Sequence, residues 1–224
     1  MHIGLIGGIG PAATEFYYRG LVNAFATANT KLDLTIVNAS TADLLRNLTH
    51  DTPRDQAEIF LALVERLKAA GADVAVVTSL GGHFCIGELE AISPLPLINV
   101  IPVLDAYFAD EGLRSIGLMG TRTVMQSRLY GGVTSVEIIV PEGEELQATH
   151  DNYVAMATVG AATDSQRHFF VSLGARLCRD RGADAIALGG TDLFVVFDGI
   201  DPGYRVIDLA QVHVDAIAER ALAS

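Results

Sequence analysis

Apolar and polar positions along the chain follow two alternating patterns. Short apolar runs rich in β-branched residues are typical of strands buried in a parallel sheet, and the segments between them have the spacing of amphipathic helices. Strands are predicted over residues 2–7, 33–38, 74–79, 97–101, 115–120, 135–140 and 184–189. Helices are predicted over residues 11–29, 53–70, 84–92, 103–112, 122–131, 144–159, 165–181 and 205–222. The alternation predicts an α/β fold whose parallel sheets carry helices on both faces.

Two segments of the first half of the chain have similar counterparts in the second half. IGLIGGIGPAAT (3–14) is similar to IGLMGTRTVMQS (116–127), and GADVAVVTSLGG (71–82) is similar to GADAIALGGTDL (182–193). The offsets, 113 and 111 residues, are nearly equal, and the segments keep the same order. Repetition of this kind predicts two structurally similar units.

The repeat predicts two pseudosymmetric, Rossmann-like lobes with a cleft between them. Lobe one would comprise residues 1–100 together with a closing helix in 205–224, and lobe two would comprise residues 103–204. Ligands of open α/β sheets bind beyond the carboxyl ends of the strands. We therefore expect Ser79 and Gly190, which follow equivalent strands, to lie on opposite sides of a ligand.

Charge and composition exclude several kinds of partner. The formal net charge is −12, and no cluster of Lys and Arg interrupts it, which argues against a nucleic acid or an anionic membrane. The opening MHIGLIGGIG lacks the basic region of a signal peptide, and no apolar run is long enough for a transmembrane helix. Cys85 and Cys178 have neither a metal-ligand spacing nor a disulfide pattern. We expect a soluble cytoplasmic protein with no metal site.

The first loop, GGIGPAA, allows three interpretations. It contains Gly-x-Gly-x-x-Ala between a strand and a helix, as a dinucleotide-binding loop does, but the second strand ends in Asn38 rather than in an acid that could hold a ribose. Alternatively, the backbone N–H groups around Gly8 and Gly10 face a carboxylate at the helix N-terminus. The third interpretation is a tight turn without a ligand.

Polar side chains follow the other strands of the repeat. His83 lies four residues after Ser79, where it could orient a substrate or carry a proton, although a lone histidine at a helix end is often structural. Thr121 and Thr123 supply hydroxyl groups at another helix start and could seat a carboxylate. By periodicity alone, His213 on the last helix is a packed or capping residue.

Five segments spread over the whole chain carry motifs of a known family. These are IGLIGGIGPAATEFYYRGLVN, GADVAVVTSLGGH, IGLMGTRTVMQSRLY, RGADAIALGGTDL and IDLAQVHVDAIAERAL. In this order they resemble the motifs of the aspartate/glutamate racemase superfamily. The resemblance implies a two-lobed fold and an isomerase that needs no cofactor.

The resemblance implies proton transfer at the α-carbon of an amino acid by two cysteine thiolates, one on each side of the substrate. Both thiols are absent from this chain, because the first position corresponds to Ser79 and the second to Gly190. A serine hydroxyl is a far poorer base than a thiolate, and glycine has no side chain. Gly81 replaces a threonine that helps to seat the substrate α-carboxylate, and Asp192 replaces a glutamate.

The positions that keep the family pattern are His83, Thr121, Thr123, Thr191 and His213. Arg54 matches an arginine that holds the side-chain carboxylate in members specific for dicarboxylates. The expected catalytic residues are Ser79 and His83. The expected substrate-binding residues are Gly8, Gly10, Arg54, Gly81, Thr121, Thr123, Gly190, Thr191, Asp192 and His213.

Two functions are compatible with these substitutions. The first is an isomerase, or a related lyase, that acts on a small amino or carboxylic acid through altered catalytic residues. The alternative is a catalytically silent homologue that binds a small carboxylate. Because glycine has no side chain, Gly190 is expected to enlarge its half of the cleft and to admit a ligand bulkier than aspartate. The resemblance also implies a homodimer.

Overall fold

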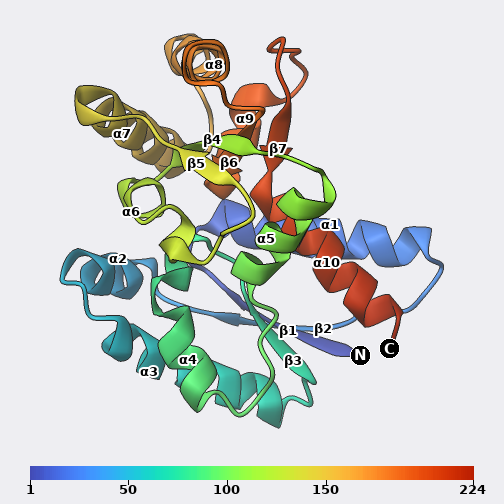
Figure 1. Ribbon diagram of the computed structural model, residues 1–224. Coiled ribbons are helices and arrows are strands. Elements are labelled where there is room, and N and C mark those ends of the chain that lie inside the picture. The colour runs from blue at the N-terminus through green and yellow to red at the C-terminus, as the bar shows by residue number, and fades with distance from the viewer. The chain divides into compact units, whose positions relative to one another are not determined.

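The computed structural model of the protein describes residues 1–224, apart from the side chain of Pro11. The chain forms two compact units (Figure 1). Unit 1 comprises residues 1–100 and 213–224, and unit 2 comprises residues 101–212. Within the described part of the chain, no helix has the length and apolar character needed to cross a membrane.

Unit 1 is built on a three-stranded parallel sheet with the strand order β2-β1-β3. Its elements are β1 (His2–Gly7), α1 (Pro11–Thr27), β2 (Asp33–Asn38), α2 (Thr41–Thr49), α3 (Pro53–Ala69), β3 (Val74–Val77), a 3₁₀ helix (Gly81–Cys85) and α4 (Ile86–Ile92). The helix α10 (Leu209–Leu222) joins this unit from His213 onwards.

Unit 2 is built on a four-stranded parallel sheet with the strand order β5-β4-β6-β7. Its elements are α5 (Val100–Asp110), β4 (Ser115–Gly120), α6 (Arg122–Gln126), a 3₁₀ helix (Leu129–Gly131), β5 (Glu137–Ile139), α7 (Gly143–Val159), α8 (Asp164–Arg181), β6 (Ala185–Gly189), a 3₁₀ helix (Thr191–Leu193), α9 (Phe194–Phe197) and β7 (Val206–Asp208). The predicted α/β class, with parallel sheets flanked by helices, is confirmed.

The two sheets repeat one topology. In each sheet the first strand, β1 or β4, lies between the second and the third strands of its unit. Beyond the third strand, β6 pairs with β7 in unit 2, and Ala75 of β3 forms a single bridge with Leu97 in unit 1. A helix follows each of these edges. α5 follows Leu97 of unit 1 but belongs to unit 2 from Ile101 onwards, and α10 follows β7 of unit 2 but belongs to unit 1 from His213 onwards.

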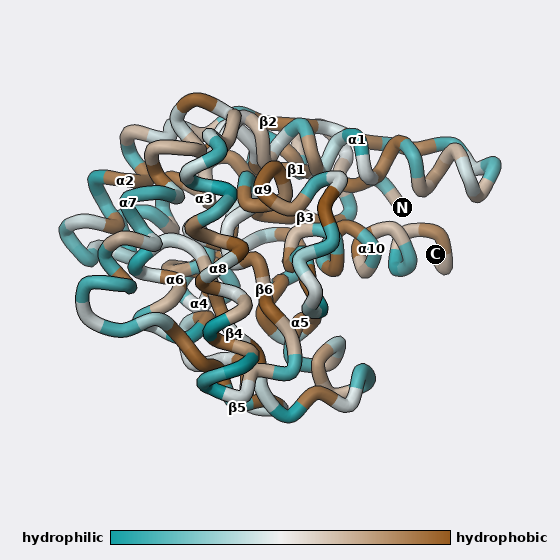
Figure 2. The backbone as a smooth tube through the Cα atoms, turned by 90° about the horizontal axis from the view of Figure 1, so that it is seen from above, coloured by the Kyte–Doolittle hydropathy of each residue, from teal (hydrophilic) through white to brown (hydrophobic). Residues whose placement is uncertain are grey.

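Buried apolar side chains attach the helices to both sheets. In unit 1, α3 buries Phe60, Val64 and Leu67, and in unit 2, α8 buries Phe170 and Leu177. In Figure 2, β3, which consists of valine and alanine, is at the hydrophobic end of the colour scale, whereas α3 alternates between both ends. Strands buried on both faces explain the continuous apolar runs of the sequence.

The predicted strand over residues 97–101 is wrong. The N–H of Ala75 donates to the Pro96 carbonyl (3.0 Å), and the N–H of Ile98 donates to the Ala75 carbonyl (3.0 Å), but α5 already begins at Val100. The segment is therefore too short to continue the pairing beyond the bridge at Leu97.

The predicted start of the last helix at residue 205 is also wrong. Val206–Asp208 pair with β6, and α10 begins one residue later. A carboxylate oxygen of Asp208 accepts hydrogen bonds from the backbone N–H groups of Ala210 (2.9 Å) and Gln211 (3.4 Å), as a residue that caps a helix does. The helices α2 and α9 and the strand β7 were not predicted.

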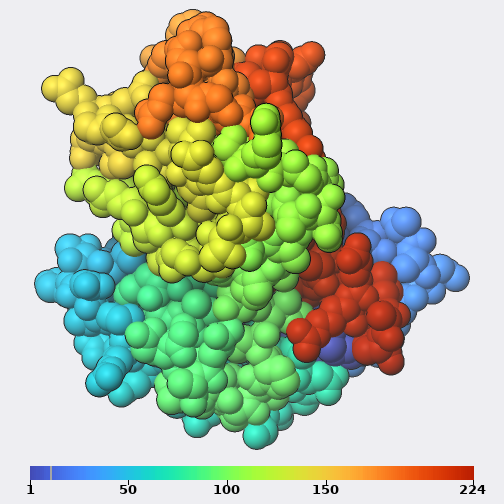
Figure 3. Space-filling model, viewed as in Figure 1, coloured from blue at the N-terminus to red at the C-terminus, as the bar shows by residue number. Residues whose placement is uncertain are grey.

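The helices α1 and α10 pack closely in unit 1 because one of them carries a glycine at the contact. In Figures 1 and 3, residues of α10 lie beside those of α1. A Cβ atom at Gly20 would lie 2.7 Å from Cγ1 of Val214, whose side chain is fully buried. The contact therefore depends on the missing side chain of Gly20.

We predict that Gly20→Ala destabilises the protein although alanine favours helix formation by about 1 kcal/mol. Overpacking against Val214 is expected to cost about 1–3 kcal/mol. The matched control is Gly87→Ala in α4, where an added Cβ would meet nothing within 4 Å, so this substitution should stabilise the protein. Urea unfolding measures both effects. Equal stabilisation by the two substitutions would contradict the packing described for α1 and α10.

Candidate functional site

Ser79 lies at the carboxyl end of β3, where the chain leaves the sheet of unit 1. The hydroxyl and N–H of the preceding Thr78 both donate to the Ile6 carbonyl (3.0 and 3.2 Å), which holds this loop beside β1. The half-buried Ser79 hydroxyl accepts a hydrogen bond from the Gly82 N–H (3.3 Å). Within the described part of unit 1, no imidazole or carboxylate hydrogen bonds to this hydroxyl, so no side chain there is placed to take its proton.

His83 supports the backbone of this loop. Its Nδ1 lies 2.7 Å from the Ser79 carbonyl oxygen, which can only accept, so Nδ1 carries the proton. Its Nε2 accepts from the Val100 N–H at 3.5 Å. Burial lowers the pKa of His83 to about 4. At neutral pH the ring is uncharged, and both of its nitrogens face backbone groups.

His213 forms a second buried imidazole beside the first, with ring centroids 6.2 Å apart. Its Nε2 donates to the Ile98 carbonyl (3.0 Å), and its Nδ1 accepts from the Tyr17 hydroxyl (2.8 Å). Burial, with a smaller contribution from His83, lowers the pKa of His213 to about 3. The residue ties α10 to α1 and to the segment before α5, and its side chain is fully buried.

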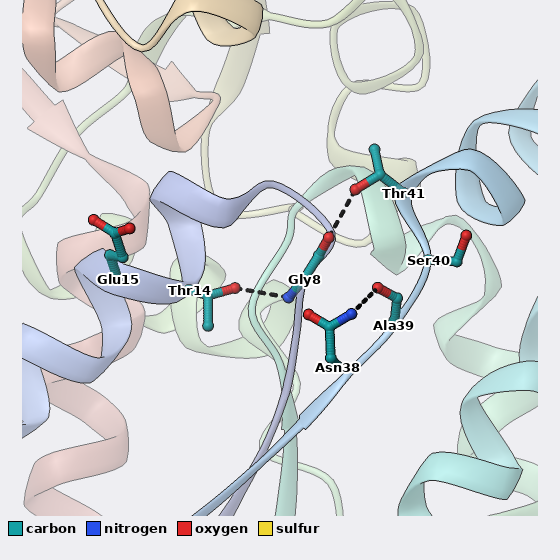
Figure 4. A pocket seen from close by; sticks show the side chains of 7 residues that line it. All are labelled: Gly8, Thr14, Glu15, Asn38, Ala39, Ser40 and Thr41. Atoms are coloured by element: carbon teal, nitrogen blue, oxygen red, sulfur yellow. Dashed lines mark hydrogen bonds between the residues drawn. The ribbon is translucent and has the colours of Figure 1, made fainter.

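An open pocket of about 630 Å³ lies at the carboxyl ends of β1 and β2 (Figure 4). The loops that form it are joined by the Thr41 hydroxyl, which donates to the Gly8 carbonyl (2.7 Å). Gly8 has φ +83°, and a Cβ atom on it would lie 2.2 Å from Oδ1 of Asn38. Glycine is therefore required here, both for the backbone conformation and for the close approach of the two loops. The pocket is lined by Gly8, Thr14, Glu15, Asn38, Ala39, Ser40 and Thr41.

Two backbone groups of the first glycine loop pair with Thr14. The Gly8 N–H donates to the Thr14 hydroxyl (2.8 Å). The Gly10 carbonyl accepts from the N–H (3.2 Å) and from the hydroxyl (3.3 Å) of the same threonine. These contacts hold the turn from β1 into α1, and the Gly8 N–H is already used in it; substrate binding by Gly8 and Gly10 stays a prediction.

Apart from Gly8, the residues that line this pocket were not predicted as site residues. Figure 4 shows Glu15 on α1, Asn38 at the end of β2, Ser40 on the loop that follows, and Thr41 at the start of α2. The sequence signal that could have found them is NAST (38–41), a polar run directly after a strand. In this run Ser40 caps α2 by accepting a hydrogen bond from the Asp43 N–H (3.3 Å).

Two other predicted residues of unit 1 lie elsewhere. Arg54 is exposed in the first turn of α3, does not line the pocket, and forms no ion pair with any described residue. Gly81 is half-buried, and a Cβ atom on it would lie at an ordinary contact distance, 3.6 Å, from the Ser79 hydroxyl. The structure brings Gly81 and Ser79 together but gives Arg54 no partner among the described residues.

In unit 2, the loops after β4 and β6 touch each other. Gly120 pairs with Gly189 in the sheet register, and a Cβ atom on Gly120 would lie 2.7 Å from the Gly189 carbonyl oxygen. The loops that this contact joins carry Thr121, which caps α6 by accepting from the Val124 N–H (3.4 Å), half-buried Thr123, and buried Gly190, Thr191 and Asp192.

The expectation that Gly190 enlarges a cleft is wrong. A Cβ atom at this position would lie 2.3 Å from Cε2 and 2.5 Å from Cζ of Tyr153, so the tyrosine ring from α7 already fills the space. The Tyr153 hydroxyl donates to Oδ2 of Asp192 (3.2 Å). Tyr153 was not predicted as a site residue, because it lies far from Gly190 in the chain, within a helix that has no motif.

Neither cysteine places a reactive thiol at a strand end. Cys85 is fully buried, its thiol donates to the Gly82 carbonyl (3.4 Å), and burial raises its pKa to about 12. Burial also raises the pKa of Cys178, which lies in α8. The described residues contain no cluster of three His, Cys, Asp or Glu side chains that could hold a metal ion.

The predicted site residues divide between the two units. Unit 1 contains Gly8, Gly10, Arg54, Ser79, Gly81, His83 and His213, and unit 2 contains Thr121, Thr123, Gly190, Thr191 and Asp192. Within each unit, adjacent strands bring loops together that are distant in the sequence.

Known proteins share this architecture along nearly the whole chain. A sequence model of the Asp/Glu/Hydantoin racemase family matches residues 6–217. The fold is similar to that of a Yersinia pestis protein provisionally named an Asp/Glu racemase, with 24% identity, a TM-score of 0.87, and coverage of 99% of this chain and 100% of that chain.

Two further solved structures have the same fold. An aspartate racemase homologue from Pyrococcus horikoshii is 21% identical, with a TM-score of 0.82 and 99% of both chains covered. An aspartate racemase from Picrophilus torridus is 17% identical, with a TM-score of 0.75 and coverage of 99% of this chain and 94% of that chain. At these identities the structures show a common fold, and the sequence match shows the membership: the chain belongs to the Asp/Glu/hydantoin racemase family.

Proposed function

We propose that the protein is a cofactor-independent isomerase, or a related lyase, that acts on a small amino or carboxylic acid through residues other than paired thiols. The observation that carries this proposal is the family match over residues 6–217, which includes every strand-end loop described above. The solved structures with this fold include the aspartate racemase from Picrophilus torridus, which supports a small amino acid as the substrate class.

The chemistry of the pocket in unit 1 supports the same substrate class. Glu15 offers a carboxylate that attracts an ammonium group, and Asn38 and Ser40 offer an amide and a hydroxyl that can donate to a carboxylate. An amino acid carries both complementary groups. Ser79 would be the side chain that meets the reacting part of the substrate from unit 1, as a hydrogen-bond donor rather than as a strong base.

In this proposal His83 and His213 are positioning residues. Both rings are buried and uncharged at neutral pH. His83 hydrogen bonds to the Ser79 carbonyl and the Val100 N–H, and His213 hydrogen bonds to the Ile98 carbonyl. A proton carrier would need a ring nitrogen that faces the substrate. The contacts of His83 therefore support a role in holding Ser79 in place, and those of His213 support a role in holding the Ile98 segment and α1.

The second candidate function is a catalytically silent protein that binds a small carboxylate. The observation that favours it is the absence of a strong base in the described part of the Ser79 loop: the hydroxyl is bonded to a backbone N–H, and the Cys85 thiol is buried with a pKa of about 12. Such a protein would bind the same acids without exchanging their protons.

The proposal also includes the oligomeric state, the location and the partners of the protein. A homodimer is supported by the family resemblance. A cytoplasmic location, without a nucleic acid or membrane partner, is supported by the net charge of −12 and the lack of a basic cluster.

We predict that the wild-type protein exchanges an α-proton, or releases a carboxylate, from at least one acid in a panel of amino, hydroxy and malonate-type acids. Ser79→Ala should slow this reaction about tenfold or more, because it removes the group at the reacting face, while the dissociation constant of the acid changes little. Proton NMR in D₂O measures the exchange, and calorimetry measures binding.

The matched control is Ser165→Ala, which removes an exposed hydroxyl from α8 and should leave the exchange rate unchanged. If the wild type binds an acid but neither exchanges a proton nor releases a carboxylate, the silent binding protein is the correct function. If Ser79→Ala keeps the full rate, Ser79 has no part in the reaction.

We predict that the protein loses stability as the pH falls from 6.5 towards 4. In this window the unfolded chain protonates both histidines, whereas the folded chain keeps His83 and His213 neutral, with pKa values of about 4 and 3. Each histidine should contribute up to about 1.4 kcal/mol of unfolding free energy per pH unit. Urea unfolding at a series of pH values measures the slope.

Relative to the wild type, His213→Gln should reduce the slope of unfolding free energy against pH by nearly the contribution of one bound proton, about 1.4 kcal/mol per pH unit. The control His168→Gln changes an exposed side chain on α8 and should keep the wild-type slope. Equal slopes for all three proteins would contradict the buried, neutral state of His213.

A further inference from the structure

Tyr153 provides the side chain that Gly190 lacks. Its ring lies against the Cα atom of Gly190, at the carboxyl end of β6, and its hydroxyl is 2.8 Å from where a Cβ atom at that residue would be. Gly190 has φ −148° and ψ 128°, an extended conformation open to any residue. The tyrosine ring, and not the backbone, is therefore what excludes a side chain at this position.

The hydroxyl of Tyr153 is paired with a carboxylate at the same strand end. It donates to Oδ2 of Asp192 at 3.2 Å, and Asp192 is 7% exposed. A buried carboxylate reduces stability unless it is well paired, and an apolar residue would fill such a place at less cost. A phenol and a carboxylate held together beyond a central strand are instead suited to moving a proton.

We propose that Tyr153 and Asp192 form the proton-transfer pair of unit 2, with the Tyr153 oxygen as the atom that meets the substrate carbon. This inference rests on the proposed isomerase function. Thr191, which lies next to Asp192, and Thr121, on the loop after β4, carry only hydroxyls, which are too weakly basic to act without such a partner.

The transfer balances without a further reactant. As the Tyr153 oxygen takes the proton from the substrate carbon, the phenolic proton moves along the hydrogen bond to Oδ2 of Asp192. Asp192 becomes a neutral acid, Tyr153 is again a neutral phenol, and the electron pair of the C–H bond stays on the substrate. The reverse sequence returns a proton to the carbon and restores the carboxylate.

The electrostatics of the pair are consistent with this direction of transfer. Burial raises the pKa of the Asp192 carboxyl, which makes it a better proton acceptor than an exposed aspartate. Burial, and then the nearby Asp192, raise the pKa of the Tyr153 phenol, so it does not ionise on its own near neutral pH. The phenol therefore needs the carboxylate in order to give up its proton.

Unit 2 offers a matched control for the tyrosine. Tyr204 also covers a glycine, since a Cβ atom at Gly174 would lie 2.2 Å from its hydroxyl oxygen. Its hydroxyl donates to the Val171 carbonyl (2.9 Å) rather than to a carboxylate. Tyr204→Phe thus removes a phenolic hydrogen bond of the same kind without touching the proposed pair.

The test compares Tyr153→Phe, Asp192→Asn and Tyr204→Phe with the wild type. Deuterium wash-in is followed by NMR for L- and D-aspartate, L- and D-glutamate, L-alanine and malonate, and the dissociation constant of each acid is measured by calorimetry. We expect Tyr153→Phe and Asp192→Asn to slow wash-in about 100-fold or more and to change the dissociation constants less than about threefold. Tyr204→Phe should keep the wild-type rate.

Failure of this inference is distinct from failure of the proposed function. If the wild type exchanges protons and Tyr153→Phe keeps its rate, the pair has no role in proton transfer, while the isomerase remains. The same holds if only Asp192→Asn is slow, because the aspartate would then act without the tyrosine. If the wild type neither exchanges a proton of these acids nor acts on any other acid of the wider panel of amino, hydroxy and malonate-type acids, both the function and the pair are overturned.

Discussion

The arrangement of the candidate site depends on glycines at strand ends where a Cβ atom would collide with a neighbouring loop or helix. Gly8 lies against Asn38, Gly120 against the Gly189 carbonyl, and Gly190 against the ring of Tyr153. Parallel strands end at one edge of a sheet, but only a missing side chain lets the segments beyond that edge come into contact. The polar pocket of unit 1 and the tyrosine–aspartate pair of unit 2 both exist because of such contacts.

The same constraint bears on the expectation that Ser79 and Gly190 stand at the two thiol positions of the family. In unit 2, the space beside Gly190 is occupied by the ring of Tyr153 from α7, whose hydroxyl donates a hydrogen bond to Asp192. In unit 1, Ser79 has a hydroxyl, and the buried His83 fixes the backbone that presents it. Chemistry in this chain would thus use side chains that are positioned by neighbouring elements, rather than two equivalent residues on equivalent strands.

Local patterns in the sequence predicted much of the fold. The apolar runs of β1, β3, β4 and β6 are buried on both faces, so their composition alone marked them, and the repeated segments indicated two sheets of one topology. β7 and the bridge at Leu97 were misjudged because they are short and lie next to helix starts. Tyr153 could not be predicted, because its importance comes from a contact with a residue 37 positions away.

The central claim is that the ring of Tyr153, and nothing in the backbone, requires glycine at position 190. A double-mutant cycle of Gly190→Ala and Tyr153→Ala, followed by urea unfolding, tests it most directly. In the presence of Tyr153, Gly190→Ala should cost about 1–3 kcal/mol, because the new Cβ atom and the ring compete for one space. In the Tyr153→Ala background that cost should disappear. An equal cost in both backgrounds would show that the ring does not lie against Gly190.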